Sequence, residues 1–238
     1  MLAWILWIGV GVGMDLQGPY ASLDEVCKAK LAEAQLDRIC QITPRTEHAA
    51  VVKVLDDLDD GRADGYLAVR DARGWFVDGE LADFKTQPQL ALLHDNLRYT
   101  FLIVGLDERP AGIVLRAVHA IFFNADTPFY CVGLKVFCRL DGDGAPVCSK
   151  PLIAAGKADC HPNQGRYWPA VAKAPRALAD WASWDWNRPI TLLDDGRIEV
   201  PRMPRLTLPR KLRKPLLSYL PATLSAPSAG RYTIDQLR

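Results

Sequence analysis

The sequence predicts a mainly-β fold, an antiparallel meander that forms a sandwich or barrel with one N-terminal helix packed on it. Runs rich in β-branched and aromatic residues recur between short turns, and one helical stretch with a capping signal precedes them. The 238 residues are 49% hydrophobic and 24% charged, which is typical of a folded protein with a sizeable core. Residues 22–238 are expected to form a single domain.

The chain opens with an uncharged, apolar run over residues 1–14 that stops at Asp15. The run is shorter than the about 20 residues of a membrane helix and fits the apolar core of a secretory signal. Cleavage after Gly13 or near Ala21 would remove it, so residues 1–21 are interpreted as a leader and the protein as exported, periplasmic or extracellular. No Lys or Arg precedes the run, and the alternative is a buried N-terminal strand or helix.

The six cysteines, an even number, fit an oxidising compartment. Cys131 and Cys138 lie on one predicted strand, more than about 20 Å apart, so they cannot bond to each other. Cys27 and Cys40 can pair only if the helix between them ends early and the chain doubles back. The preferred pairs are Cys138–Cys148, Cys131–Cys160 and Cys27–Cys40.

A helix is expected to begin at the capping box Ser22-Leu23-Asp24-Glu25, in which a hydroxyl and a carboxylate satisfy the first helical amides. It is expected to run to about Gln35 and to pack on the β domain. Its predicted apolar stripe consists of Leu23, Cys27, Leu31 and Ala34.

The predicted strands follow the apolar runs and the turns between them. They cover residues 51–55, 66–70, 75–77, 97–106, 112–123, 128–140 and 147–153. A short helix is expected around residues 176–181, and a hairpin over 186–200 turns at Asp194-Asp195-Gly196. Six prolines between residues 201 and 230 exclude long central strands from this C-terminal segment, and residues 230–234 form a last edge strand.

Three motifs follow the apolar leader: Ala-Ser-Leu-Asp-x-x-Cys at residues 21–27, the strand pair Leu67–Val77 and the hairpin from Cys138 to Cys148. In this order the chain resembles a group of uncharacterised exported bacterial proteins over residues 1–160. The resemblance implies export and β architecture, and it carries no activity.

No motif identifies a reaction. The chain lacks a Gly-x-Ser-x-Gly elbow, its four histidines (His48, His94, His119 and His161) have no ligand-like spacing, and oxidised cysteines provide no thiolate. The acidic turns at residues 56–64 and 141–144 lack the closing glutamate of a calcium loop. No catalytic residue, cofactor or metal is therefore assigned. The sequence supports a non-enzymatic protein more than an enzyme.

Two groups of residues are candidates for binding. Four tryptophans could stack on sugar rings, or they could fill the core beneath an irregular segment: Trp168, Trp181, Trp184 and Trp186. Six cations, with no acid between residues 201 and 215, could meet an anionic envelope surface or form a solvated loop: Arg202, Arg205, Arg210, Lys211, Arg213 and Lys214.

These observations favour an exported, non-catalytic protein with a binding or structural role in the cell envelope or outside the cell. The alternative is a secreted hydrolase or a carbohydrate-binding module that uses the four tryptophans. The net charge of +1 gives no overall field that would attract nucleic acid.

Overall fold

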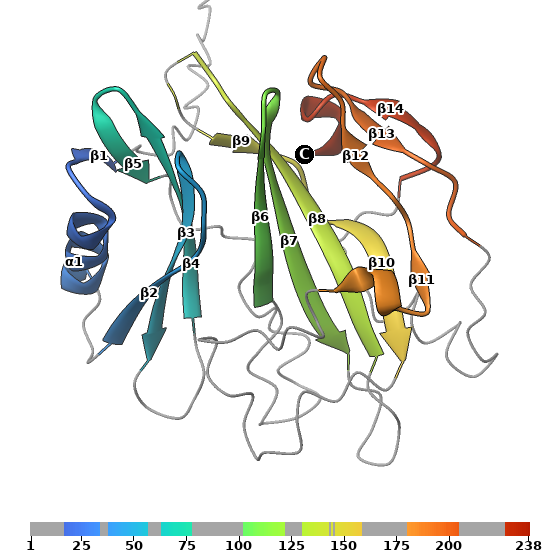
Figure 1. Cartoon of the computed structure of the whole chain (residues 1–238), viewed down its shortest axis with the longest axis horizontal. Coiled ribbons are helices and arrows are strands. Elements are labelled where there is room, and N and C mark those ends of the chain that lie inside the picture. The colour runs from blue at the N-terminus through green and yellow to red at the C-terminus, as the bar shows by residue number, and fades with distance from the viewer. Residues whose placement is uncertain are drawn as a thin grey trace, which may run out of the picture.

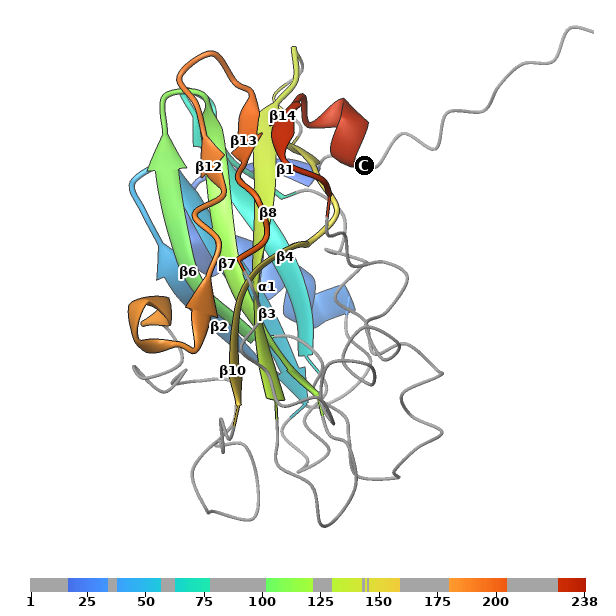
Figure 2. The ribbon, with the colours of Figure 1, turned by 90° about the vertical axis from the view of Figure 1, so that its right-hand side faces the viewer.

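The protein consists of three antiparallel sheets and one α-helix, stacked in layers (Figures 1 and 2). A computed structural model describes residues 17–33, 38–56, 63–77, 102–121, 130–142, 144, 146–158, 180–204 and 227–238. The order of the layers is helix α1 (Leu23–Glu33), sheet A, sheet B and sheet C. The predicted mainly-β architecture with an N-terminal helix packed on a sheet is confirmed.

Sheet A has the strand order β1-β5-β4-β3-β2. Its strands are Gln17–Tyr20 (β1), Arg38–Arg45 (β2), Ala49–Asp56 (β3), Ala63–Asp71 (β4) and Gly74–Val77 (β5). The predicted strands at 51–55, 66–70 and 75–77 are confirmed as parts of β3, β4 and β5. The sequence did not predict β1 and β2, which both contain a proline and lie at the two edges of the sheet, where a missing N–H is tolerated.

Sheet B is a curled half-barrel with the order β11-β10-β8-β7-β6, and β9 pairs with β8 (Figure 1). Its strands are Leu102–Arg109 (β6), Gly112–Ile121 (β7), Tyr130–Leu140 (β8), Pro146–Cys148 (β9), Leu152–Ala158 (β10) and Trp186–Asn187 (β11). The first three match predicted strands, although β6 continues to Arg109 before a tight turn. The single strand predicted over 147–153 is wrong, because the chain breaks between β9 and β10 at Pro151, which has no N–H to donate.

Sheet C is small and has the order β12-β13-β14. Its strands are Thr191–Leu192 (β12), Ile198–Val200 (β13) and Gly230–Tyr232 (β14). The predicted turn before β13 is confirmed, since Gly196 N donates to Leu193 O at 2.9 Å. The predicted long strand leading into that turn is instead divided by Pro189 into β11, which joins sheet B, and β12, which joins sheet C. The predicted strand at 230–234 stops at Tyr232, and a 3₁₀ helix follows at Asp235–Leu237.

Sheets A and B pack face to face, and alternate residues of their strands form one shared core. Val51 and Leu67 of sheet A belong to the same buried cluster as Leu115, Leu134 and Val136 of sheet B. The opposite face of sheet B contributes to a second core, which it shares with sheet C and the 3₁₀ helix Trp181–Ser183. Sheet B is therefore the central layer of the molecule.

Helix α1 covers the outer face of sheet A. The capping box is present, because Glu25 N donates to Ser22 Oγ at 3.3 Å. Its carboxylate accepts from Ala21 N at 2.8 Å, one residue earlier than in the standard motif. Two residues of the predicted apolar stripe, Leu23 and Cys27, pack against the sheet, and Ala34 lies outside the described residues. The stripe misses the two buried residues of the helix, Val26 and Lys30.

Lys30 is buried because polar and aromatic groups surround its amine. Its Nζ donates to Gln17 Oε1 at 2.6 Å and to Glu33 Oε2 at 3.0 Å, and it lies 4.6 Å from the centre of the Tyr66 ring. These contacts turn the helix so that positions 23, 26, 27 and 30, spaced as one helical face, meet the sheet. The sequence-based prediction assumed that every lysine of the helix faces solvent, and it therefore missed this face.

The structure contains two of the expected disulfides. Cys138 and Cys148 are directly paired on β8 and β9, with a Cα–Cα distance of 4.1 Å, in the predicted register about residue 143. Cys27 is bonded to Cys40, which is possible because the helix ends at Glu33 and β2 returns beside it. Cys131 is also disulfide-bonded. Its expected partner, Cys160, lies outside the described residues.

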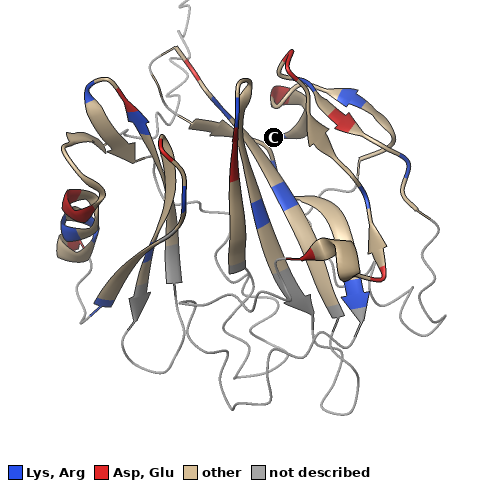
Figure 3. Ribbon diagram, viewed as in Figure 1, with Lys and Arg blue, Asp and Glu red and all other residues tan. Residues whose placement is uncertain are grey.

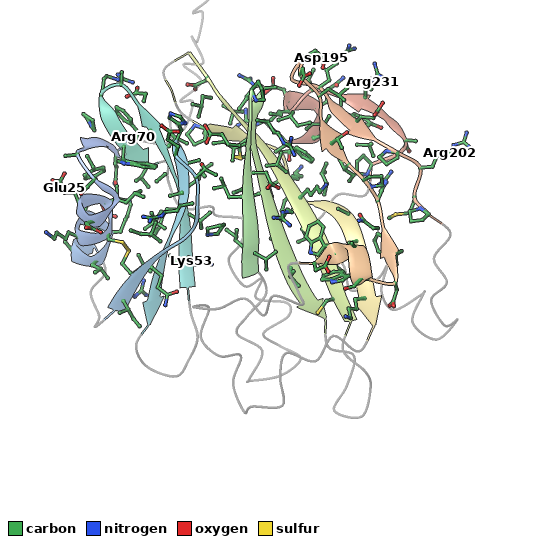
Figure 4. All side chains as sticks on the ribbon, in the orientation of Figure 1. Glu25, Lys53, Arg70, Asp195, Arg202 and Arg231 are labelled. Carbon is green, nitrogen blue, oxygen red and sulfur yellow. A yellow bond between two sulfur atoms is a disulfide. The ribbon has the colours of Figure 1, made fainter. Side chains whose placement is uncertain are left out.

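Lys53 ties sheet A to the edge of sheet B (Figure 4). Its side chain enters the layer between the sheets and is 4% exposed. The amine donates to the Ile103 carbonyl of edge strand β6 at 3.3 Å. Burial lowers the pKa of Lys53 to about 8, since removal from water disfavours the charged amine. At the exposed rim, His48 Nδ1 and Glu108 Oε1 form a second link between the sheets at 2.9 Å.

We predict that Lys53→Met stabilises the fold at pH 7. The pKa of Lys53 falls from 10.5 in the unfolded chain to about 8 in the folded protein, so only the unfolded chain holds this proton between these values. Stability due to Lys53 therefore rises with pH across that window and is lowest below pH 8. Urea denaturation at pH 7 should show a gain of about 1–3 kcal/mol for the variant, and the difference from wild type should shrink towards pH 10. A variant that is less stable at pH 7, with the same difference at pH 10, would contradict this account.

Candidate functional site

Three of the four candidate tryptophans are core residues. Trp181, Trp184 and Trp186 are each 6% exposed, and Trp168 lies outside the described residues. Trp181 and Trp184 pack between sheet B and sheet C, with ring centres 5.8 Å apart, whereas Trp186 belongs to the core between sheets A and B. The structure thus does not bring these three rings onto one exposed face, and buried rings cannot stack on a sugar.

The described parts of the acidic turns hold no group of metal ligands. Gly144 N donates to Asp141 O at 3.1 Å, which is the hydrogen bond of a turn. Most of the other acidic run, residues 57–62, lies outside the described residues. Within the ranges that the structure describes, no three His, Cys, Asp or Glu side chains are grouped to hold a metal ion.

The histidines are also dispersed. His48 is exposed and pairs with Glu108, and His119 belongs to β7. His94 and His161 lie outside the described residues. The structure therefore does not assemble a His-centred site from the residues it describes.

The basic segment, residues 202–226, connects β13 to β14 and carries all six candidate cations. Arg202 is exposed at its start and points away from the sheets (Figure 4), and no described carboxylate pairs with it. The other five cations lie outside the described residues: Arg205, Arg210, Lys211, Arg213 and Lys214. The whole segment contains no Asp or Glu.

The two ends of the basic segment are held by one buried residue, Arg188. Its side chain donates from Nε to the Pro201 carbonyl at 2.7 Å and from Nη2 to the Pro227 carbonyl at 2.8 Å. These acceptors lie 13 and 39 residues further along the chain. The Arg188 backbone N–H donates to the Ala154 carbonyl of β10 at 2.6 Å. We call this set of contacts the Arg188 clamp; it fixes both ends of the segment to the edge of sheet B.

Among the described residues, no carboxylate pairs with the positive charge of Arg188. Arg188 is 1% exposed, and its third guanidinium nitrogen, Nη1, is buried with no hydrogen-bond partner in the described part of the chain. Burial lowers the pKa of Arg188 and nearby Tyr232 raises it, but a guanidinium remains charged in proteins. Its planar fork can hold two carbonyls in fixed positions, which an ammonium cannot do as rigidly. The geometry therefore favours a role for Arg188 in positioning the two ends of the basic segment.

Sequence reasoning missed Arg188 because a single arginine beside a proline in a strand has no distinctive pattern. The other arginines near sheet C form surface pairs, Arg197 with Asp195 at 2.5 Å and Arg231 with Glu199 at 3.2 Å. An Asp-x-Arg turn or an alternating strand pattern suggests such pairs. Contacts to carbonyls 13 and 39 residues away leave no comparable signal.

We predict that Arg188→Met releases the basic segment. Two part-buried carbonyls would lose their donor, at a cost of about 1–3 kcal/mol in the free energy of unfolding. Trypsin should then cleave within residues 202–214 faster than in the wild type under native conditions. Arg231→Met removes only an exposed ion pair and serves as the control, with an effect below about 0.5 kcal/mol. Unchanged stability together with unchanged cleavage in Arg188→Met would exclude the clamp.

Among the described residues no helix is long and apolar enough to cross a bilayer. No protein-family model, curated protein or solved structure matches this chain.

Proposed function

We propose that this is an exported, non-catalytic protein that binds an anionic surface of the cell envelope through its basic segment. The observation that carries the proposal is the Arg188 clamp: a buried guanidinium holds both ends of a segment that has six cations and no carboxylate. The clamp holds the two ends of this segment at one guanidinium, so the segment begins and ends at the same place on the protein.

The distribution of charge supports this role. Arg197 and Arg231 of sheet C are neutralised by carboxylates, whereas Arg202 has no described partner. Each lysine or arginine near an anionic lipid surface contributes about 1 kcal/mol of attraction. Six such residues suffice for reversible attachment even though the whole chain has a net charge of only +1.

Export is supported by the cysteines and by the leader. The Cys27–Cys40 and Cys138–Cys148 disulfides suit an oxidising compartment, because cytosolic thiols are kept reduced. The apolar run at residues 1–14 fits a secretory signal. The carbohydrate-binding alternative has less support, since three of its four tryptophans are buried.

Vesicle binding tests the attachment. Wild-type protein should bind vesicles that contain phosphatidylglycerol, should not bind pure phosphatidylcholine, and should lose affinity between 20 and 150 mM salt as screening shortens to about 8 Å. Replacing Arg210, Lys211, Arg213 and Lys214 by Gln should weaken binding at least tenfold, given about 1 kcal/mol for each charge.

The matched control changes the net charge equally at exposed sites elsewhere: Lys28→Gln, Arg45→Gln, Lys150→Gln and Arg238→Gln. It should retain affinity within about threefold. If both quadruple variants bind equally, the attraction reflects total charge and the segment has no special role.

N-terminal sequencing tests export. Protein recovered from the envelope or medium of the producing cell should begin after residue 13, where the small residues Gly11 and Gly13 predict cleavage. Cleavage near residue 21, the other predicted position, would also remove strand β1, whose Gln17 accepts a hydrogen bond from Lys30. An intact Met1 on protein from the cytosol would contradict export. Binding to anionic vesicles would then be the only part of the proposal that still has support.

A further inference from the structure

The C-terminal segment, residues 227–238, completes sheet C as an added strand (Figures 1 and 2). Its strand β14 is antiparallel to β13, and Tyr232 lies opposite Ile198 in the strand pairing. β14 is also an edge strand of this sheet, because the strand order is β12-β13-β14. An extended peptide that is bound by β-augmentation adds to the edge of a sheet in the same way.

Two apolar side chains anchor the segment beyond β14. Ile234 is 2% exposed and Leu237 is 6% exposed, and both belong to the core cluster between sheets B and C. They are three residues apart across the 3₁₀ helix Asp235–Leu237, a spacing that places side chains on one side of such a helix. Burial of apolar side chains is the main favourable term in most protein association, so these two residues should provide most of the attraction.

Hydrogen bonds hold the main chain of the segment at both of its ends. The Pro227 carbonyl accepts from Arg188 Nη2 at 2.8 Å, and the Leu237 carbonyl accepts from Lys150 N at 2.7 Å. Arg188 lies between β11 and β12, and Lys150 lies between β9 and β10. The segment is therefore attached along its whole length and not only through β14.

The turn within the segment is held by its own side chains. Thr233 N donates to Gln236 Oε1 at 2.9 Å, and Gln236 N donates to Thr233 Oγ1 at 3.4 Å. These reciprocal bonds are those of a capping box. A peptide whose bound turn is stabilised locally loses less conformational entropy when it binds.

Ion pairs lie at the surface around the apolar contact. Asp235 pairs with Arg139 of β8 at 3.1 Å, and Arg231 of β14 pairs with Glu199 of β13 at 3.2 Å. Acidic and basic residues accordingly lie side by side on sheet C (Figure 3). Exposed pairs add little affinity, but complementary charges help to fix the register of a bound strand.

No disulfide can attach this segment to the rest of the chain, since residues 161–238 contain no cysteine. Its covalent connection to the other layers is the basic segment. The contacts described above all involve residues outside 205–226. A cut within that range therefore leaves every one of these contacts in place.

We propose that the C-terminal segment binds the rest of the protein as a peptide ligand does, so that the protein stays assembled when the basic segment is cut. Its binding surface consists of the β13 edge, the Arg188 and Lys150 donors, and the apolar residues that cluster with Ile234 and Leu237. A protease that cuts after lysine or arginine would hydrolyse one bond of the basic segment with one water, leaving a carboxylate and an amine. The product is a two-chain protein with the fold of the intact chain.

This inference does not rest on the proposed function, because its contacts involve neither a membrane nor the five cations between residues 205 and 214. Replacing residues 210, 211, 213 and 214 by Gln should leave the docking of the segment unchanged, whatever it does to vesicle binding.

A cleavable full-length chain tests the docking. A recognition site for a sequence-specific protease is inserted between Pro221 and Ala222, and the protein is cut after it has folded. The two fragments should elute together in size-exclusion chromatography in native buffer and separately in concentrated urea. Elution of the short fragment as a free peptide in native buffer would overturn the proposal.

Synthetic peptides locate the anchors. The peptide of residues 222–238, incubated to equilibrium with the cut protein, should replace the short fragment. The Leu237→Ala peptide should compete at least about twentyfold less well, as expected when a buried leucine is truncated. The Asp235→Asn peptide, which loses an exposed ion pair, should compete within about threefold of the unchanged peptide. Because the changes are in the peptide, the protein itself stays wild type, and equal competition by all three peptides would overturn the proposal.

Discussion

Both faces of sheet B are covered, and the rest of the structure depends on this constraint. One face packs on sheet A, and the other packs on sheet C and the Trp181–Ser183 turn. Strands in such a sheet are apolar at consecutive positions, as in Val-Gly-Leu and Val-Phe-Cys of β8. Each charged residue in these strands must therefore have a partner in an adjoining layer or reach the open edge at β6.

Three cations that connect the layers have backbone carbonyls as partners. Lys53 of sheet A donates to Ile103 of sheet B, Lys135 of sheet B donates to Ile190 before sheet C, and Arg188 donates to Pro201 and Pro227 at the ends of sheet C strands. A carbonyl offers a directed hydrogen bond but no neutralising charge. These contacts align the layers at an electrostatic cost, and hydrophobic burial supplies the stability.

The sequence was sufficient for elements whose signal is local. The β-branched run from Val51 to Leu55, the turn at Asp194–Gly196 and the Cys138–Cys148 register all follow from residues close in the chain. It was insufficient where distant segments decide the outcome. The face of α1 depends on Tyr66 and Gln17 around Lys30, and the positions of Arg188 and Lys135 depend on carbonyls from other layers. Composition identified the basic segment, but only the fold brings its two ends together.

The carbonyl contacts also determine how the layers respond to acid. A peptide carbonyl does not gain a proton in acid, so acid removes none of the acceptors of Lys53, Lys135 and Arg188. The layers thereby keep these acceptors while the charge on the surface of the protein changes.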